Sequence, residues 1–78
     1  MAVSSVPRMA DRPTLVIWAN TDPARNAWSA SLNLPDGRST MTPSVHSLAE
    51  ATDRAKAHGY RLDVDPLALS QMQAAGVG

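Results

Sequence analysis

The sequence predicts an α+β fold: a small antiparallel sheet of three to four strands, with one helix packed on one face and a short C-terminal helix. Three observations support this. Strand-like segments separated by turn residues fill the first half of the chain, a helix start signal follows them, and a further alternating segment comes after the helix. The expected order is therefore strand, strand, strand, helix, strand.

Two strands are expected before the first tight turn. Residues 14–20 are β-branched and aromatic at their centre and lie between proline-containing turns, which is typical of a strand. Residues 27–34 alternate larger apolar or alanine side chains with serine and asparagine. This alternation predicts a half-buried antiparallel strand.

A hairpin turn and a third strand come next. Residues 34–38 contain Pro35, which fixes φ, and Gly37, which accepts a positive φ, so the chain is expected to reverse there. A short polar strand over residues 39–42 would then form an edge of the sheet. We expect Pro43 to end it, because proline cannot donate a ladder hydrogen bond.

The main helix has clear signals at both ends. Ser47 and Glu50 have the spacing of a capping box, so the helix should begin there. The segment is rich in alanine, and Glu50 with Arg54 forms a favourable pair four residues apart. Gly59 is a natural left-handed terminator, so the helix should end near His58.

The last segment predicts a strand and a short helix. Residues 60–65 alternate, and Asp65 followed by Pro66 fits an N-cap with proline at the first helical position, ahead of a helix over residues 67–74. The larger side chains of the sheet should supply most of the core: Leu15, Ile17, Trp28, Leu32, Tyr60 and Leu62. Such a core barely outweighs chain entropy, which favours oligomerisation or a tightly bound partner.

The composition fits one small domain. The 78 residues are 44% hydrophobic, but 13 of them are alanine, and seven acidic residues balance seven basic ones. A net charge of zero argues against a nucleic-acid binder that works through bulk charge, and against an acidic nucleic-acid mimic. The absence of cysteine excludes a disulfide framework, a thiolate zinc site and a cysteine nucleophile.

The chain is expected to form a flexible N-terminal arm, residues 1–12, and a single α+β domain, residues 13–78. Residues 1–12 are mostly small or polar and have no periodicity. The longest apolar run, Leu15 to Ala19, is far shorter than the roughly 20 residues that span a bilayer. The N-terminus lacks the apolar segment of a signal peptide, so we expect a cytoplasmic protein without a membrane partner.

Part of this pattern resembles the HicB-like antitoxin domain. The residues that carry the resemblance are the strand from Trp28 to Leu34, the turn Leu34-Pro35-Asp36-Gly37 and the helix start Ser47-Leu48-Ala49-Glu50-Ala51. The same tryptophan and helix start are similar to a family of short uncharacterised bacterial proteins. The resemblance covers under half the chain and implies a domain that binds and blocks another protein. HicB-type antitoxins usually add a DNA-binding module, and the residues after Asp65 are too few to form one.

Catalytic and metal-binding patterns are weak. His46 and His58 would lie at the two ends of the helix, about 18 Å apart, too far to share an active site. Asp63 and Asp65 would lie on one strand face, about 7 Å apart, where they and Asp53 could hold a hard cation such as Mg²⁺. Solvent exposure and helix capping explain them more simply. We expect no enzyme activity, cofactor or metal.

The expected function is non-enzymatic protein binding. The chain would act as a small bacterial or phage inhibitor or antitoxin-like protein, anti-CRISPR inhibitors included, that blocks a larger host or toxin protein, as a monomer or a homodimer. A polar strand face, an edge strand and a loop could meet the partner by strand addition and polar contacts, with Trp18 and Met41 as anchors. The expected contact residues are Trp18, Asp22, Arg25, Asn26, Ser29, Ser31, Arg38, Thr40 and Met41.

The alternative is a small nucleic-acid-binding regulator. It would use Arg25, Arg38 and Arg61 for phosphate contacts. The aromatic residues would stack on bases if they were exposed.

Overall fold

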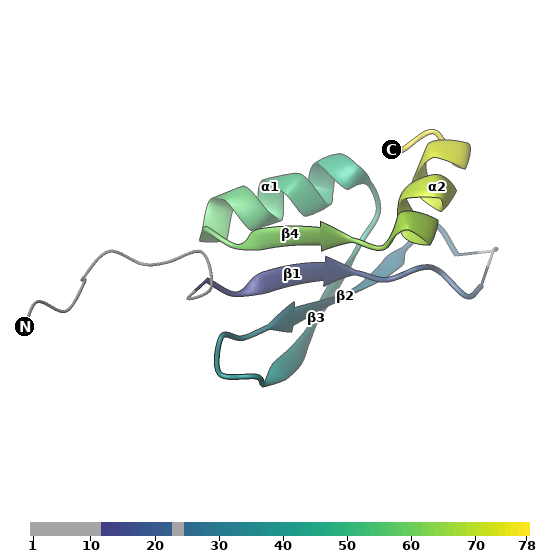
Figure 1. The fold of residues 1–78 in the computed structure, drawn as a ribbon. Helices are drawn as coiled ribbons and strands as arrows, with labels where there is room; N and C mark the ends of the chain where they lie inside the picture. Colours follow the sequence, from purple (N-terminus) through teal and green to yellow (C-terminus); the bar gives the residue numbers. More distant parts are fainter. Residues whose placement is uncertain (1–11, 23–24) are drawn as a thin grey trace, which may run out of the picture.

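The computed structural model describes residues 12–22 and 25–78 (Figure 1). Across these residues the α+β fold and the predicted order of elements are confirmed. The elements are β1 (Thr14–Ile17), β2 (Trp28–Asn33), β3 (Ser39–Val45), α1 (Leu48–His58), β4 (Arg61–Val64) and α2 (Pro66–Ala74). The predicted N-terminal arm lies, apart from Arg12, outside the described residues.

The four strands form one sheet in the order β3-β2-β1-β4. The two hairpin-type pairings, β1 with β2 and β2 with β3, are antiparallel, with Leu15 opposite Leu32. The expectation of a wholly antiparallel sheet is wrong for one pairing, because β4 runs parallel to β1, with Leu15 opposite Leu62. The cause is α1, which carries the chain back across the sheet so that β4 runs in the direction of β3.

The third strand extends to Val45, past the predicted stop at Pro43. The register between β2 and β3 shifts between Trp28 and Ala30, so β3 carries one more residue than β2 at this point. Pro43 lies in this bulge and on an edge strand. Its missing N–H therefore removes no ladder hydrogen bond, which is why the strand continues through it.

Both helices lie on one side of the sheet (Figure 1) and cover its centre. The largest fully buried side chains are Leu15, Ile17, Met72 and Val45. From α1 only alanines are buried, which brings the helix close to the sheet but adds little apolar area. Leu62, expected in the core, is instead 36% exposed, because it lies on the edge strand β4 beyond the cover of these small side chains.

The helix ends follow the predicted local signals. The Ser47 hydroxyl accepts a hydrogen bond from the backbone N–H of Glu50 at 3.0 Å, and Gly59 ends α1 with φ of 70°. The Asp65 carboxylate accepts from the N–H of Leu67 at 2.8 Å and caps α2. Neither helix within residues 12–22 and 25–78 is long and apolar enough to cross a membrane.

Candidate protein-binding face

The side of the sheet opposite the helices, called the open face below, is formed by alternate residues of all four strands. The strand registers align these residues in rows across the sheet. The middle row, from β4 to β3, is Asp63, Val16, Ser31 and Met41. The row at the start of β1 is Arg61, Thr14, Asn33 and Ser39. At the other end, Trp18 donates a backbone hydrogen bond to Ser29, and the two residues extend the face beyond the end of β1.

Trp18 is the aromatic residue of the open face. Its side chain is 48% exposed, although its indole Nε1 donates a hydrogen bond to the hydroxyl of Ser31 at 2.8 Å. This bond fixes the direction of the ring along the face. Ser31 itself is only 6% exposed, so it positions the indole rather than offering a contact of its own. The exposed part of the indole is therefore apolar ring surface whose polar atom is already satisfied.

Met41 lies across the sheet from the indole. It pairs with Ser31 in the β2–β3 register and is 70% exposed. Val16, between Asp63 and Ser31 in the same row, is buried. Trp18 and Met41 thus project on either side of two buried residues, Val16 and Ser31.

Polar and charged side chains surround these two anchors. A hollow of about 280 Å³ beside the indole is lined by Val16, Trp18, Asn33, Asp63, Asp65 and Pro66. Asp63 and Arg61 are exposed at the β4 side, and Ser39 is exposed at the β3 side. The face therefore exposes an apolar side chain at two places, Trp18 at one end and Met41 on the edge strand β3, with polar and charged side chains around them.

The other predicted contact residues lie elsewhere. Thr40 pairs with Leu32, so it belongs to the helix side of the edge strand. Arg38 lies in the β2–β3 hairpin, where its Nε donates to the carboxylate of Asp36 at 2.7 Å. Neither side chain adds to the open face. The residues of the loop between β1 and β2 form a separate site beside α2.

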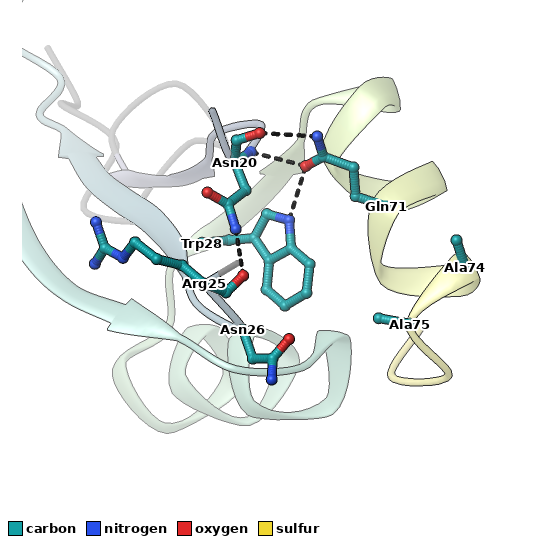
Figure 2. Close-up of a pocket in the computed structure, with 7 residues that line it drawn as sticks. All are labelled: Asn20, Arg25, Asn26, Trp28, Gln71, Ala74 and Ala75. Carbon is teal, nitrogen blue, oxygen red and sulfur yellow. Dashed lines mark hydrogen bonds between the residues drawn. The ribbon is translucent and has the colours of Figure 1, made fainter. Parts of the chain in front are cut away.

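That loop borders a pocket of about 310 Å³ against α2 (Figure 2), lined by Asn20, Arg25, Asn26, Trp28, Gln71, Ala74 and Ala75. The predicted residues Arg25 and Asn26 are part of its wall, and Asp22 lies in the same loop. The side chain of Gln71 connects α2 to the loop and to β2 by hydrogen bonds. Its Oε1 accepts hydrogen bonds from the indole of Trp28 at 2.9 Å and from the backbone N–H of Asn20 at 2.7 Å, and its Nε2 donates to the carbonyl of Asn20 at 2.9 Å.

The polar atoms of this pocket are largely used by the fold itself. Asn20 also donates through Nδ2 to the carbonyl of Arg25 at 2.6 Å, which ties the loop to the end of β1. The polar groups that line the pocket therefore anchor the loop between β1 and β2. Sequence reasoning missed Gln71, because it acts on a residue 51 positions away and carries no local signal of that role.

The histidine and carboxylate candidates do not form a shared site. His46 and His58 lie at opposite ends of α1, where Nδ1 of His46 is 3.5 Å from Glu50 and the ring of His58 stacks on Tyr60. Asp63 lies on the open face, on the other side of the sheet from Asp53 in α1. No cluster of three or more potential metal ligands occurs in the described part of the chain.

Comparison with known proteins finds no match to a protein family, a curated protein or a solved structure. The large hydrophobic side chains exposed in the described residues fall into two pairs. Trp18 and Met41 lie on the open face, while Leu62 and Leu67 lie on β4 and at the start of α2.

Proposed function

We propose that the protein is a non-enzymatic protein-binding module that blocks a larger protein with its open face, as a small inhibitor or an antitoxin does. The observation that supports this most is the state of Trp18. Its indole is about half exposed while its N–H is held by Ser31. A surface that served only solubility would not need a fixed aromatic ring in this position.

The geometry suits tight binding by few residues. Because the hydrogen bond to Ser31 already orients the indole, little side-chain entropy is lost when a partner covers it. No polar atom of the ring has to lose its partner on binding. Met41 is unbranched and adapts to the shape of the opposite surface. Tryptophan is also among the residue types that most often dominate binding energy.

The polar rim would provide specificity. Arg61 and Asp63 place opposite charges on one side of the anchors, and Ser29 and Asn33 add hydrogen-bonding groups without charge. Charged rim residues mainly steer association and reject wrong partners. The exposed edge of β3 adds backbone groups for strand addition, although its bulge at Pro43 limits such pairing to residues 39–42.

Nucleic-acid binding receives less support from the same geometry. Arg25 lies in the loop beside α2, Arg38 in the β2–β3 hairpin and Arg61 on β4. The hairpin and the start of β4 are at one end of the sheet, on opposite edges, and the loop is at the other end. The arginines therefore do not form a continuous basic surface of the kind that follows a phosphate backbone.

The test is affinity capture from a lysate of the host cell with nuclease-treated controls, followed by calorimetry with the purified partner. We expect Trp18→Ala to weaken binding of that partner about 30-fold, which corresponds to ~2 kcal/mol. Met41→Asp should weaken it as well, because a carboxylate would have to be buried against the partner.

Leu67→Ala is the matched control, since it removes an exposed apolar side chain that lies off the open face. It should leave the affinity unchanged. A partner that binds Trp18→Ala and Met41→Asp as tightly as the original chain would contradict the proposal. Recovery of nucleic acid alone would contradict it too.

A further inference from the structure

The outer edge of β4 has unpaired backbone groups and a distinctive charge pattern. The N–H groups of Arg61 and Asp65 donate to the carbonyls of Pro13 and Ile17, on the β1 side. Because successive residues of a strand direct these groups to opposite sides, the N–H and C=O of Leu62 and Val64 point away from β1. Arg61, Leu62 and Asp63 are all exposed.

The two edges of the sheet differ in protection. β3 carries a proline and a bulge, both of which hinder pairing with another strand. β4 has neither a proline nor a bulge within Arg61–Val64. It carries one positive and one negative side chain two residues apart, on the same face, with a partly exposed leucine between them.

We propose that the β4 strands of two copies of this chain pair antiparallel. The two copies are related by a two-fold axis that passes midway between Leu62 of one copy and Leu62 of the other. Leu62 would lie opposite Leu62 of the second copy, and the two residues would exchange both of their outward N–H and C=O groups. The outward N–H of Val64 would donate to the carbonyl of Tyr60 of the second copy. The two four-stranded sheets would become one continuous sheet.

The charge pattern selects this register. With the axis at Leu62, Arg61 lies opposite Asp63 of the second copy, and the same pair occurs twice by symmetry. With the axis at Arg61, the two Arg61 side chains would lie opposite each other. With the axis at Asp63, the two Asp63 side chains would lie opposite each other, although Arg61 would then face Asp65 of the second copy. Like charges directly opposite each other destabilise a strand pair, whereas opposite charges support it. An axis at Val64 would place Leu62 opposite Pro66, which has no N–H to donate.

The dimer leaves the two anchors of the function proposed above uncovered. The two-fold axis is perpendicular to the sheet, so the helices of both copies lie on one side and both open faces on the other. Each copy keeps its own Trp18 and Met41 exposed. Arg61 and Asp63 would change from rim residues of one copy to cross-strand pairs between copies.

The first test measures the mass of the full chain over a range of concentrations by sedimentation equilibrium. At high concentration we expect twice the 8.3 kDa of one chain. Arg61→Asp and Asp63→Arg should each weaken the dimer about tenfold or more, because each places like charges opposite one another at two positions. The double variant R61D/D63R restores opposite charges and should restore the dimer.

Arg38→Asp is the matched control, since it makes the same change of charge near the opposite edge of the sheet. It should leave the dimer intact. A chain that stays monomeric at millimolar concentration would overturn the proposal, as would a dimer that both single variants leave unchanged. Recovery in the double variant separates loss of pairing from loss of folding, because both single changes are still present in it.

A second test fixes the register. The chain has no cysteine, so Leu62→Cys introduces a single thiol. Residues directly opposite each other in a hydrogen-bonded pair have Cα atoms about 5.5 Å apart, within the range of a disulfide. We expect oxidised glutathione to produce a covalent dimer of Leu62→Cys but not of Thr40→Cys on β3. A covalent dimer of Thr40→Cys alone would show that the other edge pairs and would contradict the proposal.

Discussion

Gln71 should contribute more to stability than any other exposed or half-buried polar side chain of α2, and Gln71→Ala tests this. The side chain makes three hydrogen bonds, to Trp28 and to both backbone groups of Asn20. Each such bond contributes a net of about 0.5–1.5 kcal/mol, and a buried donor left without a partner costs about 1–3 kcal/mol. The indole N–H of Trp28 would be such a donor, since Trp28 is only 3% exposed.

The adjoining pocket reduces the expected loss. With about 310 Å³ of space against the same wall, water can reach the backbone groups of Asn20 once the amide is gone. We therefore place the loss near the cost of the indole donor and expect the free energy of unfolding to fall by about 2 kcal/mol. For a domain of this size, the midpoint of thermal unfolding should fall by roughly 8–16 °C.

The assay is urea unfolding followed by far-ultraviolet circular dichroism, with the slope m compared between variants. Gln73→Ala is the matched control, because it makes the same substitution at an exposed position of the same helix. It should change stability by less than ~0.5 kcal/mol. In a Trp28→Phe background the indole donor is absent, so Gln71→Ala should cost clearly less there. An equal cost in both backgrounds, or a loss below ~0.5 kcal/mol in the original chain, would refute the reasoning.

Three further predictions concern α1 and are checked by the same unfolding assay. Ser47→Ala removes the acceptor of the Glu50 N–H and should cost about 1 kcal/mol, whereas Ser47→Asp should keep most of the stability; equal losses in both would contradict a capping role. Gly59→Ala should cost about 1–2 kcal/mol, because φ is 70° there, although an added Cβ would meet nothing within 4 Å. Gly59→Asn should cost less, since asparagine tolerates this conformation better than alanine. Ala51→Leu should destabilise by about 1–3 kcal/mol, because Ala51 is fully buried against the sheet, and an increase in stability would show that the helix has room to move away.

The elements could be predicted where the signal is local. The N-cap Ser47, the terminator Gly59 and the N-cap Asp65 each depend on neighbours within a few residues, and the structure confirms all three. The second half of the capping box does not form, because the Glu50 carboxylate lies near His46 and Arg54 instead. The alternation of residues 27–34 likewise predicted which side chains of β2 face the helices. Such signals depend on short-range hydrogen bonds and strand pleating, which tertiary contacts rarely change.

The features that could not be predicted from the sequence all depend on contacts between distant segments. Nothing within residues 60–65 indicates whether their strand runs parallel or antiparallel to its neighbour, since this depends on the path of α1. In a regular strand ladder Pro43 would end the strand, because it cannot donate a hydrogen bond. Here the bulge and the edge position leave no ladder hydrogen bond for it to lose, so β3 continues. For the open face, alternation predicted Ser29 and Ser31, and composition suggested Trp18 and Met41. Only the strand register shows that the indole, Ser31 and Met41 lie together.

The two pairs of exposed hydrophobic side chains have different causes. Trp18 and Met41 lie on the side of the sheet opposite both helices, whereas Leu62 lies on the helix side, where α1 buries only alanines and covers the edge strand β4 only in part. A partner on the open face or a second copy at β4 would bury apolar area that the chain cannot bury alone. Anything that binds only the folded chain stabilises it by RT ln(1 + [L]/Kd), about 2.7 kcal/mol at a hundredfold excess over Kd. If the β4 dimer forms, the midpoint of thermal unfolding should therefore rise with protein concentration in the original chain and rise less over the same range in Arg61→Asp, and this measurement needs no knowledge of the protein partner.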